Sequence, residues 1–328
     1  MNRSPNPPPT DREEPGLPER LEVLILPSQP VTAATPPPKP LSRHPVIALL
    51  RPKQWAKNLL VFAAPGAAGL LTGFSVASRA SVAFASLCLM ASATYIVNDI
   101  LDAPADRIHP LKGSRPVASG QIAVRPALVL GVALLVAGLA VATYLGLGFV
   151  EVVAAYVGLS VAYSLVLKRL EVIDIAVVAA CFVLRAVAGA AATGVTLSSW
   201  FLILVSAGAL LVVAGKRMAD LRFAHREGIE SFERRAVYPE SFLRGVWVLS
   251  AAVAVMAYIL WSQAFPHNID GVAWSQVSAA PFVIALLRYT LIIERGGAGA
   301  PEDVFKSDHV LQAVVLVWLV AYAIGVYL

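Results

Sequence analysis

The chain has 328 residues, of which 58% are hydrophobic and only 14% are charged. A soluble domain carries roughly 25% charged residues, and a single core cannot hide this much apolar surface. Several apolar runs also exceed the roughly 18 residues that mark a membrane-spanning helix. The composition therefore excludes a soluble globular protein and predicts an all-α membrane protein.

The N-terminal segment, residues 1–44, contains 12 prolines and scattered charge. Such a composition cannot form a packed core, so we expect a disordered cytoplasmic tail. Residues 45–328 are expected to form one membrane domain of nine spans, the first of which bends near Pro65. The predicted spans cover residues 46–72, 78–98, 125–146, 149–167, 173–193, 198–215, 242–262, 272–291 and 308–327.

The 26 Lys and Arg residues are distributed unevenly along the chain. Of these, 24 lie in the tail or in loops that nine spans place on one side of the membrane, the exceptions being Arg79 and Arg185. The positive-inside rule then places the N-terminus and these loops in the cytoplasm, and the C-terminus outside. We therefore expect a multi-pass plasma-membrane protein. The same asymmetry accounts for the net charge of +5, so no nucleic-acid partner is expected.

Four oxygen-bearing side chains gather where the second predicted span ends. On helical geometry they fall within an arc of roughly 100°, although Pro104 is expected to break the helix among them. Carboxylate and amide oxygens suit Mg²⁺, which usually completes its shell with substrate phosphate. The spacing therefore predicts a Mg²⁺ site, the alternative being a solvated acidic helix end. The predicted ligands are Asn98, Asp99, Asp102 and Asp106.

Basic residues lie close to these acids in the predicted cytoplasmic segments. Arg107, Lys112 and Arg115 follow the acidic cluster directly. Beside a metal-bound polyphosphate, such side chains hold the outer oxygens, whereas the alternative is ordinary interfacial charge. Lys53 and Lys57 lie one helical turn apart near the start of the first span, where they would grip an anionic lipid head or anchor the helix.

Polar residues also mark the fourth and fifth predicted spans. Tyr163 and Lys168 lie near the end of the fourth span, where Lys168 could bind a phosphate. Asp174 lies at the start of the fifth span. It could be a metal ligand, accept a hydrogen bond from a ribose hydroxyl, or serve as the helix N-cap. Arg185 lies about 16 Å deeper along the same helix. A charge at that depth indicates function, the alternative being structural pairing with Glu151 or with carbonyl groups.

The Asp-rich motif and the basic run behind it resemble the first Asp-rich motif of the UbiA superfamily of intramembrane prenyltransferases. The nine predicted spans agree with that fold, and the resemblance covers about residues 45–328. It implies a nine-helix transmembrane bundle with a cytoplasmic-side active-site cavity that opens to lipid. In such enzymes, Mg²⁺ holds a diphosphate substrate at the mouth of the bundle.

Further segments are similar to one branch of the superfamily, which transfers a phosphoribosyl group to a polyprenyl phosphate. They include the strings from Leu50 to Asn58, from Leu184 to Gly189 and from Gly215 to Leu221. In the third string, Lys216 and Arg217 stand where ordinary prenyltransferases carry a second Asp-rich motif. Two cations there suit a phosphate monoester better than a second metal ion.

This resemblance implies Mg²⁺-dependent transfer of 5-phosphoribosyl from phosphoribosyl diphosphate (PRPP) to a polyprenyl phosphate such as decaprenyl phosphate, for cell-wall synthesis. The alternatives are transfer of a polyprenyl group to a small acceptor and, outside enzymes, a membrane transporter. A homo-oligomer is left open. The expected catalytic residues are Asp102, Asp106, Lys168 and Asp174. The expected substrate-binding residues are Lys53, Lys57, Arg107, Lys112, Arg115, Tyr163, Arg185, Lys216 and Arg217.

Overall fold

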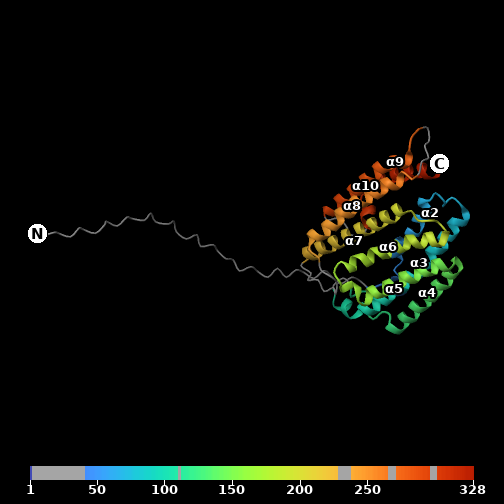
Figure 1. Ribbon diagram of the computed structural model, residues 1–328. Coiled ribbons are helices and arrows are strands. Elements are labelled where there is room, and N and C mark those ends of the chain that lie inside the picture. The colour runs from blue at the N-terminus through green and yellow to red at the C-terminus, as the bar shows by residue number, and fades with distance from the viewer. Residues whose placement is uncertain (2–40, 110–111, 228–237, 265–270, 296–300) are drawn as a thin grey trace. The chain divides into compact units, whose positions relative to one another are not determined.

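The computed structural model describes Met1 and residues 41–109, 112–227, 238–264, 271–295 and 301–328 (Figure 1). Most of the predicted tail, and residues 228–237 of the loop before the seventh predicted span, lie outside the described residues. The described residues form helices and no β-strand, as the hydropathy pattern predicted. In lipid a helix satisfies its backbone hydrogen bonds within one segment, which is why apolar composition leads to this fold class.

Within the described residues, eight segments are long and apolar enough to cross a membrane, the short helix α9 counting together with α10. They coincide with the second to ninth predicted spans. Two further short helices, η2 (Leu167–Arg169) and α11 (Pro301–Ser307), lie in the connections between them. The long segments are α3 (Phe74–Ile108), α4 (Val124–Leu145), α5 (Leu147–Leu165), α6 (Ile173–Thr193), α7 (Ser199–Glu227), α8 (Glu240–Ser262), α9 (Trp274–Val277) with α10 (Ala279–Glu294), and α12 (His309–Tyr327).

The first predicted span is built differently. It consists of three short helices, α1 (Pro45–Leu50), the 3₁₀-helix η1 (Pro52–Phe62) and α2 (Ala63–Ala67). The chain breaks at Arg51, which has left-handed dihedral angles of φ 53° and ψ 56°. Pro52 disfavours the right-handed helical conformation at the residue before it, so α1 ends there. The break therefore lies at Arg51 and not near Pro65, which is buried inside α2.

Helix α3 is longer than predicted, because Pro104 does not break it. The helix runs on to Ile108 with the proline inside it. A proline removes one helical hydrogen bond and crowds the carbonyl group four residues earlier. Pro104 is exposed near the end of the helix. All the acids of the predicted metal motif are thus carried by one uninterrupted helix.

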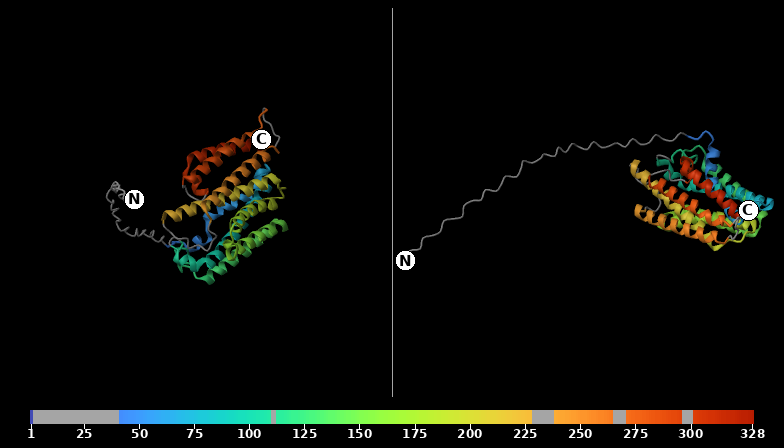
Figure 2. Two further views of the ribbon diagram at one scale, coloured as in Figure 1. Left: turned by 60° about the vertical axis from the view of Figure 1, so that its left-hand side comes forward. Right: turned by 90° about the horizontal axis from the view of Figure 1, so that it is seen from above.

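Helices α3 and α6 form the centre of the bundle. Of the most apolar 18-residue stretch of α3, 61% is buried within the protein, whereas the corresponding stretch of α12 is 17% buried. Helix α3 packs on α4, α5, α6 and η1, and α6 packs on η1, α5 and α7. Helices α4 and α5 lie at one edge of the bundle, and α8 and α10 lie at the other (Figures 1 and 2). The outer helices therefore expose apolar side chains that suit contact with lipid.

A close backbone approach fixes η1 against α6. A Cβ atom at Gly189 would lie 1.8 Å from the carbonyl oxygen of Val61, so no side chain fits at this position. One turn earlier on α6, Arg185 Nε donates a hydrogen bond of 2.9 Å to Asn58 Oδ1 of η1. Helix η1 also packs on α3. These contacts hold the N-terminal segment, including Arg51, beside the acidic end of α3.

Candidate active site

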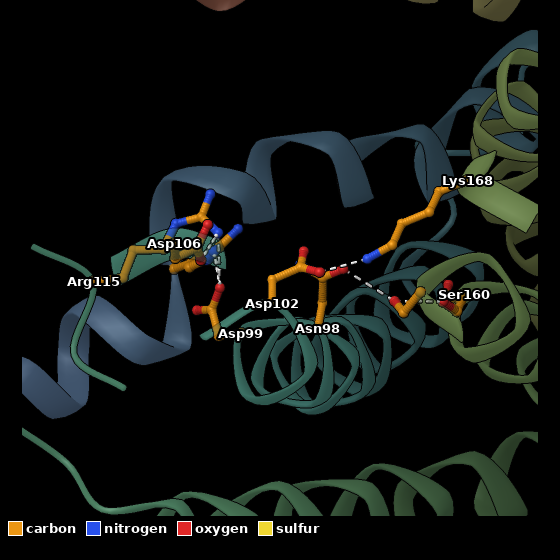
Figure 3. A network of polar contacts seen from close by, with 9 residues as sticks. Asn98, Asp99, Asp102, Asp106, Arg115, Ser160 and Lys168 are labelled. Atoms are coloured by element: carbon orange, nitrogen blue, oxygen red, sulfur yellow. Dashed lines mark hydrogen bonds and ion pairs between the residues drawn. The ribbon is translucent and has the colours of Figure 1, made fainter. Parts of the chain in front are cut away.

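The acids of α3 lie at the end of the helix and point in two directions (Figure 3). Asp99 and Asp106 face Arg115, which the loop after α3 carries back over the helix. Asn98 and Asp102 face Lys168, which lies in η2. The predicted single cluster of ligands is therefore two neighbouring acid–base groups in this structure.

In the first group, two carboxylates converge on one nitrogen atom. Arg115 Nη1 lies 2.6 Å from Asp106 Oδ2 and 3.3 Å from Asp99 Oδ1. Arg51 Nη2 also pairs with Asp99 Oδ1, and its guanidinium lies 5.4 Å from the centre of the Tyr95 ring. The side chain of Asp99 is only 2% exposed. A buried carboxylate needs such charged partners, so this arrangement selects positive charge between Asp99 and Asp106.

In the second group, a buried lysine reaches the remaining acid. Lys168 Nζ lies 2.5 Å from Asp102 Oδ1, and the lysine side chain is 7% exposed. Asn98 Nδ2 donates to Asp102 Oδ2 at 3.0 Å, and Ser164 Oγ donates to Asn98 Oδ1 at 3.2 Å. The Ser160 carbonyl, 3.0 Å from Ser164 Oγ, is a second acceptor for the same hydroxyl. The orientation of Asp102 is therefore fixed by contacts from both α3 and η2.

A third acidic group lies on α6. Asp174 is fully buried in the first turn of the helix, where its Oδ2 accepts a hydrogen bond of 2.7 Å from Arg217 Nη2. Arg217 Nη2 also donates to the Tyr163 hydroxyl at 3.2 Å. The N-cap position of α6 belongs to Val172, so the interpretation of Asp174 as the N-cap is wrong. Arg217 thus contacts an internal carboxylate.

Tyr238 completes this group and was not among the predicted site residues. Its hydroxyl donates to Asp174 Oδ1 and accepts the Val172 N–H at 2.6 Å. Val172 has a positive φ of 63°, a strained conformation for a β-branched residue. Burial and the hydrogen bond to Asp174 raise the pKa of Tyr238 to about 12. A single tyrosine therefore bridges a strained turn and a buried carboxylate.

Arg185 lies apart from the acids. Its guanidinium donates to Asn58 Oδ1, to the Tyr156 hydroxyl at 2.9 Å and to the Cys181 carbonyl at 2.6 Å. It also lies 4.7 Å from the centre of the Tyr156 ring. Arg185 has no acidic partner among the described residues, so the alternative of pairing with Glu151 is wrong and that of pairing with a carbonyl is confirmed. A contact with substrate stays a prediction.

For the other predicted basic residues the described contacts are with groups outside the three acidic groups. Lys53 is exposed, and Arg107 Nε donates to the Ala118 carbonyl at 3.3 Å. Lys57 Nζ donates to Gln54 Oε1. Lys216 is exposed, with Nζ 4.0 Å from Asp220 Oδ2.

Lys112 is half-buried in the loop after α3. Of the predicted substrate-binding residues, Arg115 and Arg217 thus contact acids of the three groups described above, and Tyr163 contacts Arg217.

Arg51 is a second site residue outside the predicted catalytic and binding sets, although it begins the segment that was expected to grip an anionic lipid head or anchor the helix. The sequence carried a signal for it, because an Arg-Pro pair marks the end of a helix and therefore a turn. That signal does not show where the guanidinium points. For Tyr238 the only sequence signal was its position just before the seventh predicted span.

Among the described residues, no three His, Cys, Asp or Glu side chains lie close enough together to share a metal ion. Mg²⁺ commonly takes only one or two carboxylates and completes its shell with phosphate and water. Asp99 and Asp106 already converge on one positively charged atom, so this pair fits such an ion. The four-ligand set stays a prediction.

The fold and site define a multi-pass membrane protein of the UbiA prenyltransferase family, and the chain belongs to that family. The family model matches residues 59–311. Among solved structures, a UbiA homolog from Archaeoglobus fulgidus bound to DMAPP and Mg²⁺ superposes with a TM-score of 0.63 at 19% identity. The match covers 86% of this chain and 99% of that one, and it establishes a shared fold.

Two relatives place the chain more narrowly within the family. A decaprenyl-phosphate phosphoribosyltransferase from Corynebacterium glutamicum is 40% identical over 297 residues, which cover 89% of each chain. The decaprenyl-phosphate phosphoribosyltransferase from Mycobacterium tuberculosis is 42% identical over 278 residues, which cover 84% of this chain and 91% of the relative. The similarity therefore includes nearly the whole length of both relatives.

Proposed function

We propose that this protein transfers the 5-phosphoribosyl group of PRPP to a polyprenyl phosphate, with decaprenyl phosphate as the expected acceptor. The observation that carries the proposal is the 40–42% identity to decaprenyl-phosphate phosphoribosyltransferases over nearly their full length. The protein is accordingly a transferase.

The reaction needs charge stabilisation more than proton transfer. An oxygen of the lipid phosphate forms a bond to C1 of the ribose while the bond from C1 to the diphosphate oxygen breaks. The electron pair of that bond leaves with the diphosphate. The lipid phosphate is already an anion at neutral pH, so it needs no general base. The protein must hold the two substrates in line and neutralise the leaving group.

The acid–base groups of α3 have the chemistry for this task. We infer that Asp99 and Asp106 hold Mg²⁺, with Asn98 and Asp102 as further predicted ligands. The bound ion would neutralise oxygens of the diphosphate. Arg115 and Lys168 already lie beside these carboxylates, so they would donate to the remaining diphosphate oxygens.

We also propose that the site faces the cytoplasm and that the protein lies in the plasma membrane. The uneven distribution of Lys and Arg supports this orientation. The three acidic groups gather where α3 and α5 end and α6 begins, which suits a water-soluble donor meeting a lipid phosphate at the membrane surface.

Transfer of a polyprenyl group remains the alternative, because the family is named for that activity. Both activities use a diphosphate leaving group and fit the acids of α3. The segment that begins with Lys216 and Arg217 disfavours the alternative. Within the string from Gly215 to Leu221 the one acidic residue is the exposed Asp220, and Arg217 pairs with Asp174 of α6.

A labelling experiment separates the two activities. Purified protein with Mg²⁺ receives decaprenyl phosphate and PRPP labelled in the ribose, and a parallel reaction receives a labelled prenyl diphosphate with an aromatic acceptor. We expect the ribose label to enter the lipid fraction and the prenyl label to stay on its diphosphate. Transfer of the prenyl label alone would contradict the proposal.

A further inference from the structure

The acidic end of α3 is balanced by charges of the protein itself. Asp99 and Asp106 pair with Arg51 and Arg115, and Asp102 pairs with Lys168. Three carboxylates thus face three cations, and the formal charges cancel. A metal site that simply awaits its ion would hold an excess of negative charge. Here an entering cation must first displace a positive side chain.

Arg51 is held in this position by its surroundings. Its left-handed conformation is unfavourable for a residue with a side chain. Trp55 Nε1 donates to Ser92 Oγ at 3.0 Å, and Ser92 Oγ donates to the Leu50 carbonyl at 2.9 Å. These bonds tie the turn on both sides of Arg51 to α3. The backbone on both sides of Arg51 is therefore held so that its guanidinium lies against Asp99.

We propose that Arg51 is a diphosphate-binding residue that serves as the counter-ion of Asp99 until substrate arrives, so that Mg²⁺ and diphosphate bind together and neither binds well alone. The inference rests on the proposed function. A divalent ion at Asp99 and Asp106 displaces guanidinium charge, which then needs an anion. The diphosphate supplies that anion and receives the released guanidinium in a charge-assisted hydrogen bond. If diphosphate bound without Mg²⁺ and drew Arg51 to itself, the carboxylate of Asp99 would lose its counter-ion and would repel the diphosphate.

The test measures ligand-induced shifts in the melting temperature of the purified protein in detergent. The ligands are MgCl₂ alone, inorganic diphosphate alone, and both together. For the wild-type protein we expect small shifts with either ligand and a combined shift larger than their sum. In Arg51→Gln the half-saturating concentration of Mg²⁺ alone should fall by about tenfold. The shift in melting temperature with both ligands should then equal the sum of the two separate shifts.

Two further variants make the result specific. Arg51→Lys keeps the charge and should retain the cooperative pattern. Arg43→Gln removes an equal charge from an exposed position in the same segment and should behave as wild type. Should Arg51→Gln fail to fold, Arg51→Gly replaces it, because glycine accepts the left-handed backbone.

Additive shifts in the wild-type protein, or unchanged cooperativity in a folded Arg51→Gln, would overturn the inference. The outcome is independent of the labelling experiment. If ribose transfer occurs while the shifts are additive, the role of Arg51 fails and the proposed function stands. If the shifts are cooperative while no ribose label reaches the lipid, the inference stands and the proposed function fails.

Discussion

Two acidic groups near the same end of the bundle use the same residue types under different solvation. In the α3 group the carboxylates of Asp99 and Asp106 are also buried, but the arginines paired with them are 23% and 26% exposed, so solvent and ligands can reach these ion pairs from the arginine side. In the α6 group, Asp174 is 0% exposed and its oxygens are taken by Arg217 and Tyr238. A reachable pair can exchange partners with a substrate, whereas a sealed pair holds helices together. The exposure of the paired arginines, rather than residue type, separates the candidate site from a group that only stabilises the fold.

The largest expected effect tests the sealed group. Arg217→Ala leaves the buried Asp174 without its paired cation, which should lower the free energy of unfolding by about 3–5 kcal/mol. The measurement is denaturant unfolding in detergent. The double variant Asp174→Asn with Arg217→Gln serves as a control, because it removes both charges and should recover most of the loss. Unchanged stability with a raised KM for PRPP would instead support the predicted phosphate-binding role of Arg217.

In the α3 group, substitution of a carboxylate should lower activity rather than stability. Asp106→Asn keeps the shape of the side chain and removes the charge, so kcat should drop by about 10²–10³-fold. Arg115 retains Asp99 as a partner, so the melting temperature should change little. Steady-state rates and thermal unfolding of the same preparation check both parts. Near-normal turnover, or full activity in excess chelator, would remove the metal hypothesis.

A smaller loss is expected when the tyrosine of the sealed group loses its hydroxyl. Tyr238→Phe removes a donor to Asp174 and an acceptor for the Val172 N–H, which should cost about 1–3 kcal/mol of stability. The raised pKa of Tyr238 gives this contribution a defined pH range. Because folding favours the protonated phenol, the contribution is full below pH 10 and is lost as pH rises toward about 12.

Thermal unfolding from pH 8 to 12 tests that range. The wild-type protein should lose stability more steeply than Tyr238→Phe above pH 10, and the two curves should converge. Parallel curves would show that folding does not raise the pKa of the Tyr238 phenol.

Lys216→Gln gives the smallest expected effect on stability. The pair with Asp220 is exposed and separated by 4.0 Å, so its loss should change the free energy of unfolding by no more than about 1 kcal/mol. If Lys216 binds a phosphate monoester, the KM for PRPP or for the polyprenyl phosphate should rise about 10- to 100-fold. An unchanged KM for both substrates would leave only interfacial charge at this position.

The sequence was least informative about side chains that form hydrogen bonds within the protein rather than with a ligand. Arg185 indicated function by its depth, yet its guanidinium binds Asn58, Tyr156 and a carbonyl group, and so joins η1, α5 and α6. Arg79, the other exception in the charge distribution, donates to the Ala192 and Leu145 carbonyls in the last turns of α6 and α4. Arg79 thus satisfies carbonyl groups at helix ends, whereas Arg185 satisfies polar groups buried inside the bundle.

The sequence by itself determined the membrane class, eight of the nine predicted spans and the order of the acids along α3. These features depend on local physics, because in lipid each apolar segment must close its own hydrogen bonds, and helical spacing then orders the side chains. Only the tertiary structure decided which base meets which acid. Arg51 and Asp99 are 48 positions apart in the chain, and Tyr238 and Asp174 are 64 apart. Such pairs form because Gly189, Pro52 and the packed helices bring distant segments together, and no local pattern encodes that approach.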